Sequence, residues 1–423
     1  MRLYCFIGCV SLFSTALFAQ SYPNIQIPPV SAKYPYNECE PSIAINPRNP
    51  NEISAGSIIQ GYHYSSDGGK TWQSSALKSP YGVYGDPVLQ YDNQGRLYYF
   101  HLSDYKKATR IDRIVCQVAD KPGHFSKGSF PAPNGAKVQD KHWVVIDPKT
   151  NVVYMTWTQF DVYDSTDPED SSMVMFSKST DRGLSWTAPL CISKFNGDCS
   201  DGDNSLEGAV PALGPNGEIC VTWSGPRGIM FQRSTDGGLT WFAEERKVID
   251  HIGGWDYQIP GFFRSNGMPF LLSDLSGGPQ HGTLYLNWSD QRGGPDNTDV
   301  WLLKSTDLGE TWSEPIRVNQ DSSNRHQFLC NMAVDPIRGD LHFVYYDRRR
   351  FKDNRTDVYW ATSTDGGQTF KEQRISERPF MPKAMVFFGD YLSIAAYDGR
   401  VRPIWPRMDD QRISLWVALI DLK

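Results

Sequence analysis

The sequence lacks the features of several large protein classes. No apolar residues recur with helical periodicity over a useful length, which argues against a helical protein. Lys and Arg number 42 against 48 Asp and Glu, and the basic residues are scattered, so no patch suits a nucleic acid. No Cys-x-x-Cys or Cys/His spacing indicates zinc, and we expect no other catalytic metal.

The N-terminus has the features of a secretory signal peptide. Residues 1–19 begin with Arg2, continue with apolar residues and end on the small residue Ala19. The apolar stretch is too short to span a membrane. A lipoprotein signal at Cys9 is the alternative. We therefore expect export to the periplasm or the medium, with one domain over residues 20–423.

Six of the eight cysteines lie beyond residue 19. An exported protein can oxidise its thiols. Cys191 and Cys199 flank one short loop and are the best candidates for a disulfide. Cys220 and Cys330 lie in apolar, strand-like runs, where a buried free thiol is an equally good interpretation.

What the sequence does contain is one eight-residue phrase, Ser-x-Asp-x-Gly-x-Thr/Ser-Trp/Phe, repeated five times. Repetition at roughly regular intervals indicates a repeat architecture. The copies are residues 65–72, 179–186, 234–241, 305–312 and 363–370.

Each copy predicts a turn between two strands. An Asp side chain accepts hydrogen bonds from backbone N–H groups that follow it in a turn, and the Gly suits a positive φ. The terminal aromatic residue is large enough to pack between neighbouring sheets. We therefore interpret the five Asp residues as structural, not catalytic.

The strand pattern predicts an all-β propeller of four-stranded antiparallel blades. Seven first strands can be placed, giving about 55 residues per blade, although six blades are the alternative. The last unit shows three strands, and residues 25–27 are predicted to supply its outer strand. The first strands are expected at 41–45, 87–91, 143–146, 209–213, 269–272, 329–334 and 391–395.

Strand direction then locates the functional face. The repeated Asp turns join third to fourth strands, so they share an end with the turns between first and second strands. The opposite end collects the segments that start each blade and the connections between second and third strands, and a site is expected there. Candidate catalytic residues at the blade starts are Asp86, Asp140, Glu207 and Tyr391.

Arginines near the ends of second strands form a second candidate set. Asp and Arg recur together in Asp290–Arg292, Asp347–Arg349 and Asp410–Arg412. A guanidinium binds carboxylate or sulfate in a bidentate manner, which favours an anionic sugar. Pairing of these Asp and Arg residues with each other between blades, which would only hold the ring together, is the structural alternative. The candidate substrate-binding residues are Arg292, Arg348, Arg407, Asp290 and Asp347.

Other polar residues in these connections have simpler interpretations. His63 and His101 are interpreted as ordinary loop histidines. The acidic loops 161–170 and 198–203 could hold a structural calcium ion through oxygen ligands, but a solvated acidic loop is favoured. No cofactor is otherwise expected.

The five Asp turns, the blade pattern and the N-terminal signal resemble the Asp-box (BNR-repeat) propellers, whose best-known members are exo-α-sialidases. Residues 40–47, 140–143, 346–349 and 388–391 also resemble secreted bacterial sialidase-like proteins. The resemblance implies Asp86 or Asp140 as acid/base, Glu207 with Tyr391 as nucleophile pair, and Arg292 and Arg348 in an arginine triad. The chain departs from sialidases by lacking an Arg-Ile-Pro motif and by having seven units instead of six.

Three functions follow as hypotheses. The leading one is a secreted sialidase-like glycoside hydrolase acting on a terminal anionic sugar. The second is a lyase of uronic-acid polymers, with His101, His142 or Tyr391 as base. The third is a non-catalytic propeller that binds glycans or proteins, which the missing Arg-Ile-Pro motif favours. We expect a monomer with no membrane span.

Overall fold

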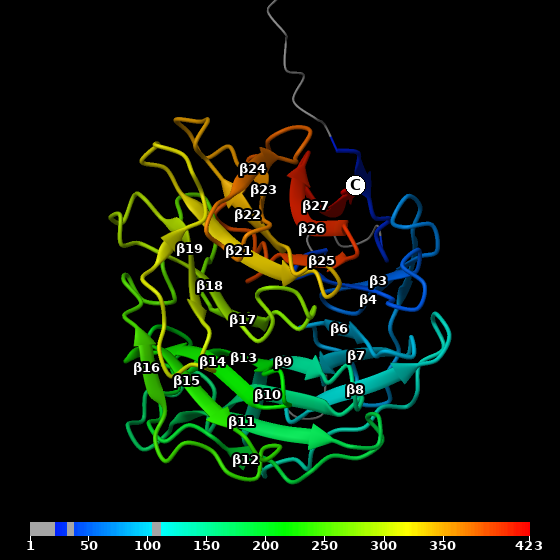
Figure 1. Ribbon diagram of the computed structural model, residues 1–423, viewed down its shortest axis with the longest axis vertical. Coiled ribbons are helices and arrows are strands. Elements are labelled where there is room, and N and C mark those ends of the chain that lie inside the picture. Colours follow the sequence, from blue (N-terminus) through cyan, green and yellow to red (C-terminus); the bar gives the residue numbers. More distant parts are fainter. Residues whose placement is uncertain (1–21, 32–37, 104–110) are drawn as a thin grey trace, which may run out of the picture.

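The computed structural model describes residues 22–31, 38–103 and 111–423, and in that part of the chain every regular element is a β-strand. The strands form seven antiparallel sheets arranged around one axis (Figure 1). The first blade contains β2 (Ser42–Ile45), β3 (Ile53–Ser57), β4 (Gly61–Ser65) and β5 (Gln73–Ala76). The second contains β6 (Val88–Tyr91), β7 (Leu97–Leu102) and β8 (Ile114–Ala119).

The remaining blades follow in chain order. The third contains β9 (Val138–Ile146), β10 (Val153–Phe160), β11 (Ser172–Ser179) and β12 (Leu190–Cys191). The fourth contains β13 (Glu207–Leu213), β14 (Ile219–Gly225), β15 (Gly228–Ser234) and β16 (Arg246–Ile249). The fifth contains β17 (Phe270–Ser273), β18 (Leu284–Asp290), β19 (Asp299–Ser305) and β20 (Ile316–Arg317). The sixth contains β21 (Gln327–Val334), β22 (Leu341–Asp347), β23 (Asp357–Ser363) and β24 (Lys371–Arg374).

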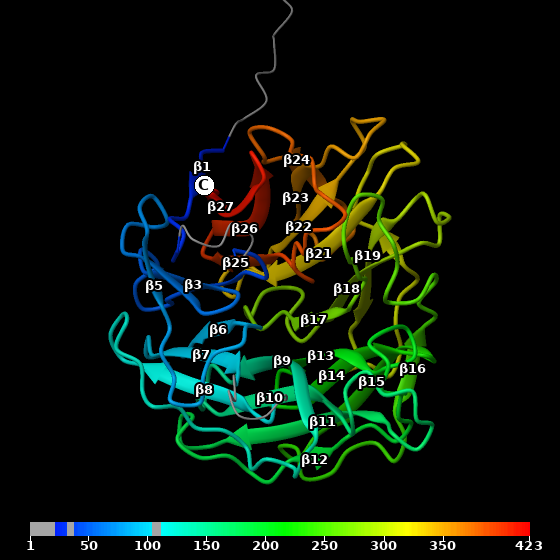
Figure 2. The same cartoon turned by 180° about the vertical axis from the view of Figure 1, so that it is seen from behind.

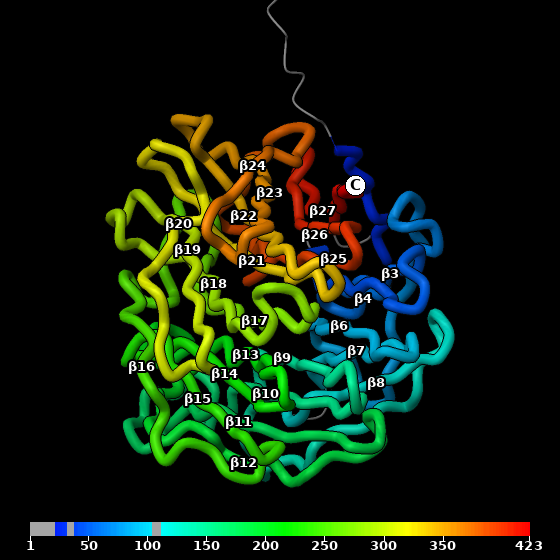
Figure 3. Tube along the Cα trace, viewed as in Figure 1, coloured from blue at the N-terminus to red at the C-terminus, as the bar shows by residue number. Residues whose placement is uncertain are grey.

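The seventh blade closes the ring with both ends of the chain. It contains β25 (Ser393–Tyr397), β26 (Arg400–Asp409), β27 (Arg412–Ala418) and, as its outer strand, β1 (Asn24–Gln26); β28 (Ile420–Asp421) pairs with β26. Ile25 lies opposite Val417 in the β1–β27 ladder. The trace in Figure 3 shows the N-terminal strand beside the C-terminal strands. The sequence prediction that residues 25–27 supply this strand is confirmed.

The first strands form the inner wall of the ring. Each contacts the first strand of the next blade, in the order β2, β6, β9, β13, β17, β21 and β25, and β25 contacts β2 again. Figure 2 shows the same closed ring from behind. Seven blades are therefore the correct count, and the six-bladed alternative is excluded. Closure leaves few strand edges open to another chain.

The repeated Asp turns pack as the sequence predicts. In the third copy, Oδ1 of Asp236 accepts hydrogen bonds from the backbone N–H groups of Leu239 (3.0 Å) and Thr240 (2.9 Å). Gly238 has φ +85°, and a Cβ there would lie 2.5 Å from the ring of Phe176 in the preceding blade. Trp241 packs edge-on against the same ring, at 5.0 Å between centroids. The turn therefore joins one blade to the blade before it.

The predicted disulfide is wrong. Cys191 and Cys199 are both free thiols, as are Cys220 and Cys330. Cys199 is buried beside Val138 and Phe160, whereas Cys191 packs in another cluster, against the second and third blades. The two side chains thus belong to different packing clusters, which short spacing in the sequence cannot reveal.

The predicted signal peptide lies outside the described residues. Within the described part of the chain, no helix is long and apolar enough to cross a membrane.

Candidate functional site

A cavity of about 670 Å³ opens at the end of the ring opposite the Asp turns. Residues that precede first strands line it, together with the ends of β3 and β7 and the β16–β17 connection, residues 250–269. Its ionisable residues come from five blade starts and from two long connections. They are Glu40, Asp86, Asp140, Lys141, Asp201, Glu207, Arg264 and Asp390.

Backbone geometry at the blade starts turns these side chains towards the cavity. Glu40, Asp86 and Lys141 have φ values of 50°, 47° and 44°, a region that non-glycine residues seldom adopt. In the third and fourth blades the pairing register shifts beside Asp140 and Glu207, as a β-bulge requires. Strained residues of this kind are common at functional sites, and three of the eleven non-glycine residues with positive φ in the described chain line this one cavity.

Lys141 is the buried cation at the centre of this group. Its Nζ lies 3.1 Å from Oδ2 of Asp390 and 3.7 Å from Oδ2 of Asp86. It also lies 5.3 Å from the ring centroid of Tyr391. Burial opposes the charge, but the surrounding carboxylates, with Asp86 first among them, raise the pKa of Lys141 well above its ordinary value. The ammonium is therefore held charged.

Glu40 and Asp86 form one pair of carboxyl groups. Oε1 of Glu40 accepts a hydrogen bond from the backbone N–H of Asp390 (3.1 Å). Burial, and then the charge of Asp86, raise the pKa of Glu40 well above its ordinary value. Glu40 therefore favours its protonated form, and Oδ2 of Asp86 lies 3.7 Å from Nζ of Lys141. Oδ2 of Asp86 is buried and has no hydrogen-bond partner among the described residues.

Asp140 and Glu207 form a second pair. Burial, and then the charge of Asp86, raise the pKa of Asp140 to about 7. Burial, and then the charge of Asp140, raise the pKa of Glu207 well above its ordinary value. Among the described residues neither has a cation within ion-pair distance, in contrast to Asp390. At neutral pH this pair therefore carries at least one proton that it can donate.

Arg264, from the β16–β17 connection, is the second cation of the cavity. Its Nε donates to Oδ1 of Asp390 (2.8 Å) and its Nη1 to Oδ2 of Asp201 (2.9 Å). The connection is held across the mouth by Phe262, whose ring packs 4.9 Å from that of Phe328 and 5.2 Å from that of Phe388. Sequence reasoning missed Arg264 because this irregular stretch has no counterpart in the other blades.

Tyr391 lies just inside the inner wall and is 4% exposed. Its ring packs 5.5 Å from the ring of Trp143 and beneath the ammonium of Lys141. Burial, and then the charges of Asp86 and Glu40, raise the pKa of Tyr391 well above its ordinary value. The phenol is therefore protonated, and Glu207, its expected partner, is not among the groups that influence it.

The three candidate arginines do not line the cavity. Arg292 donates to Asp290 (2.7 Å) and packs over Trp301. Arg348 is fully buried, donates to the carbonyl of Pro260 (2.7 Å) and packs between Phe262 and Phe328.

Arg407 donates to Asp409 (2.7 Å) and lies over Trp416, and Asp347 pairs with Arg349 (2.7 Å). Asp290–Arg292 and Asp347–Arg349 thus pair within a blade, whereas the structural alternative expected pairing between blades.

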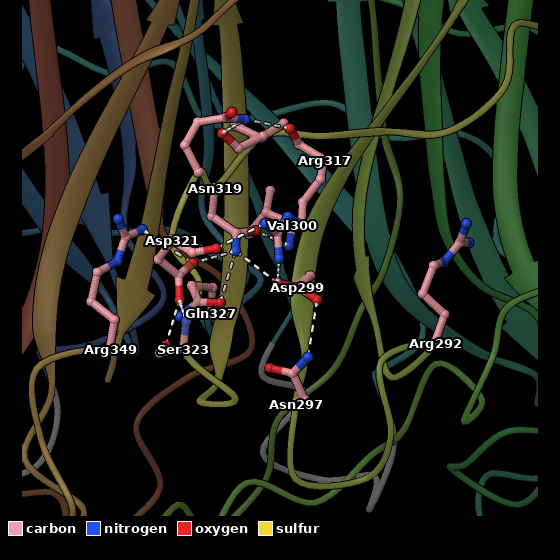
Figure 4. Close-up of polar contacts among 12 residues, drawn as sticks. Arg292, Asn297, Asp299, Val300, Arg317, Asn319, Asp321, Ser323, Gln327 and Arg349 are labelled. Atoms are coloured by element: carbon pink, nitrogen blue, oxygen red, sulfur yellow. Dashed lines mark hydrogen bonds and ion pairs between the residues drawn. The ribbon is translucent and has the colours of Figure 1, made fainter.

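A polar network between the fifth and sixth blades lies between Arg292 and Arg349 (Figure 4). Nδ2 of Asn319 donates to Asp299 (2.7 Å), Asp321 (2.8 Å) and Gln327 (2.9 Å). Figure 4 shows Arg292 and Arg349 on opposite sides of this network. Because they lie apart, these two residues do not form one carboxylate-binding site.

The histidines lie in the interior. His63, His101 and His142 are buried, and burial lowers the pKa of His63 to about 3 and those of His101 and His142 to about 4. None of the three lines the cavity. In the described part of the chain, no three His, Cys, Asp or Glu side chains are arranged to hold a metal ion, the acidic loops included.

Comparison with known proteins agrees with this architecture. Residues 63–74 match the BNR/Asp-box repeat family. A sialidase of Bacteroides fragilis (strain YCH46) is 23% identical over 249 residues, which are 54% of this chain and 41% of that protein. The chain thus spans less than half the length of this relative.

Two solved structures show the same fold. An ulvan lyase from a new family of polysaccharide lyases has a TM-score of 0.54 at 13% identity, covering 92% of this chain and 96% of that one. The endosialidase of phage phi92 has a TM-score of 0.52 at 12% identity, covering 95% of this chain and 69% of that one. The repeat match, the curated relative and the seven blades, five of which carry an Asp turn, together support a BNR sialidase-like β-propeller.

Proposed function

We propose that the protein is a glycan-cleaving hydrolase whose site is the carboxyl-rich cavity at the mouth of the propeller. The observation that carries the proposal is the presence of two carboxyl pairs in one cavity, of which Asp140–Glu207 keeps a proton at neutral pH and Asp86 lies 3.7 Å from the ammonium of Lys141. Glycoside hydrolysis ordinarily requires one protonated and one ionised carboxyl group.

The proposed reaction uses Asp140 as general acid. Its proton passes to the glycosidic oxygen as the bond between that oxygen and the anomeric carbon breaks. A water molecule adds its oxygen to the anomeric carbon and gives its proton to Asp86. Burial, and then the charge of Asp86, hold the proton on Asp140 up to about pH 7, and Glu207 beside it favours its protonated form as well.

Aromatic side chains suit the cavity to a sugar ring. Tyr84 and Tyr163 line the cavity and are 54% and 41% exposed. Trp255 lines it as well and is buried. Such rings offer an apolar face to a sugar and a polar edge to its hydroxyl groups. Tyr391 enters the proposal as a residue that positions Lys141, because its phenol is protonated and buried.

The proposal is tested by measuring new reducing ends on a panel of neutral, amino, uronic and sialylated glycans. On any substrate that is cleaved, Asp140→Asn should lower kcat by about 100-fold or more, the usual effect of losing a general acid. Asp181→Asn is the matched control. It replaces Asp with Asn in the same blade, but in the Asp turn at the end opposite the cavity. An unchanged rate in Asp140→Asn contradicts the assignment.

A uronic-acid lyase is the second candidate, and likeness to the ulvan lyase in fold supports it. Elimination needs a cation that neutralises the substrate carboxylate and a base that removes the neighbouring proton. In the cavity both cations already contact Asp390, and the histidines lie outside it. The same assay distinguishes the reactions, since a lyase product contains a double bond that absorbs in the ultraviolet and a hydrolysis product does not.

A further inference from the structure

The charges that line the cavity are unequal in number. Six carboxyl groups face two cations, Lys141 and Arg264. Both cations already contact Asp390, and Arg264 contacts Asp201 as well. Neither is therefore free to bind a substrate carboxylate or sulfate without giving up a buried partner, which is costly.

Carboxyl groups without a cation partner are concentrated on one side of the cavity. Asp140 and Glu207 have no ion-pair partner among the described residues, and Asp201 influences both. Each accepts one hydrogen bond from the protein, Asp140 from the backbone N–H of Lys141 and Glu207 from the hydroxyl of Thr158. Buried Oδ2 of Asp86 has no hydrogen-bond donor in the described chain. These groups leave acceptor oxygens for whatever occupies the cavity.

The rim on the same side is also acidic. Tyr163, which lines the cavity, donates from its hydroxyl to Oδ2 of Asp201 (2.7 Å). It lies within the acidic loop 161–170, and the loop 198–203 carries Asp198, Asp201 and Asp203. A cavity and rim in which carboxyl groups outnumber cations attract ligands of positive charge and repel those of negative charge.

We propose that the sugar bound in this cavity carries a protonated amine, so that the substrate is a glycan containing free hexosamine units. This inference rests on the proposed function for the location of the sugar. The amine binds beside Asp140, Glu207 and Asp201, and a sugar ring lies against Tyr163. A three-donor ammonium satisfies carboxyl oxygens that a neutral hydroxyl group satisfies only in part.

Calorimetry on the full-length mature protein tests the inference through binding, independently of turnover. The probes are β1,4-linked oligomers of glucosamine, N-acetylglucosamine and glucuronic acid of equal length, with glucosamine and galactosamine as monosaccharides. We expect the amine to bind at least about tenfold more tightly than its acetylated counterpart, and the acid to bind least. The advantage of the amine should shrink as salt is raised.

Two variants locate the effect. Asp201→Asn should reduce the advantage of the amine several-fold. Asp198→Asn should reduce it less, since Asp198 is exposed and its Oδ1 accepts from the backbone N–H of Ser200, a role that Asn keeps. Glu314→Gln, an exposed charge beside the Asp turn of the fifth blade, is the matched control and should leave every affinity unchanged.

The outcomes separate this inference from the proposed function. Tight binding of the amine without cleavage supports the inference and counts against the hydrolase. If the protein cleaves a sialylated or uronic glycan and this cleavage depends on Asp140, the proposed hydrolase function stands and the inference of an amine-bearing substrate is wrong. The inference is also wrong if the acidic oligomer binds as tightly as the amine, or if no amine binds at millimolar concentration.

Discussion

Nζ of Lys141 lies 3.1 Å from Oδ2 of Asp390, although the two residues are 249 positions apart in the chain. Lys141 starts the third blade and Asp390 precedes the seventh, so the ion pair crosses the axis of the ring. Both side chains are almost fully buried, at 9% and 1% exposed. This contact joins the proposed site to the closure of the propeller.

Replacing Lys141 with Met should therefore destabilise the fold. The change leaves Asp390 and Asp86 without the cation between them, and removal of one partner of a buried pair costs about 3–5 kcal/mol. Urea unfolding followed by tryptophan fluorescence measures the loss. Combining Lys141→Met with Asp390→Asn should cost less than the sum of the two changes.

The control for this experiment is Lys149→Met. Lys149 is exposed at the other end of the same blade and should change stability by less than about 0.5 kcal/mol. Equal stability of Lys141→Met and the wild type would show that the ammonium is not needed to hold these carboxylates.

The pKa of Asp140 predicts how activity and stability depend on pH. Asp140 is protonated below about pH 7, so a rate that needs its proton should fall as the pH rises through about 7. The unfolded chain loses the same proton near the ordinary value of 3.8, so this residue makes the wild type less stable as the pH rises from about 4 to 7. Asp140→Asn removes that loss.

The measurement compares urea midpoints of the two proteins at several pH values. Relative to the wild type, Asp140→Asn should gain stability between pH 5 and pH 8. A constant difference across this range would mean that the carboxyl group titrates near its ordinary value.

The sequence predicted the blades and the end of the ring that holds the cavity, because strand alternation and the Asp turns are local patterns. It also put Asp86, Asp140 and Glu207 at blade starts, and the structure brings these three into one cavity. It could not choose between the two interpretations of Arg292, because pairing with Asp290 and binding a substrate require the same residues. Arg264 depends on the path of one irregular connection, which no repeat predicts.

The Asp turns should contribute stability that is lost in acid. Burial raises the pKa of Asp181, but four hydrogen bonds together outweigh it and hold the pKa at about 2, led by those from the hydroxyl and the backbone N–H of Ser185. A depressed pKa contributes stability above the ordinary value of 3.8 that disappears as the pH falls towards 2. Asp181→Asn should cost up to about 1 kcal/mol at pH 7, since solvent screens this exposed site, and nothing at pH 2.

The free cysteines predict how many thiols of the denatured protein can be alkylated. All six cysteines among the described residues are free thiols. After denaturation without a reductant, a chain that begins at residue 20 should therefore take up six alkylating groups, as counted by mass spectrometry. Uptake of four would indicate a disulfide, and peptide mapping would show whether Cys191 and Cys199 form it.

Ring closure by β1 predicts a large effect from a small change near the N-terminus. Ile27, directly after β1, is 2% exposed and packs with Ile404, Leu415 and Val417 of the seventh blade. Ile27→Ala should cost about 2–4 kcal/mol, the usual result of truncating a buried isoleucine. The neighbouring Gln26 is exposed and serves as the control, because Gln26→Ala keeps the β1–β27 ladder and removes no buried apolar group. If urea unfolding shows equal losses for both variants, β1 does not close the ring through this core.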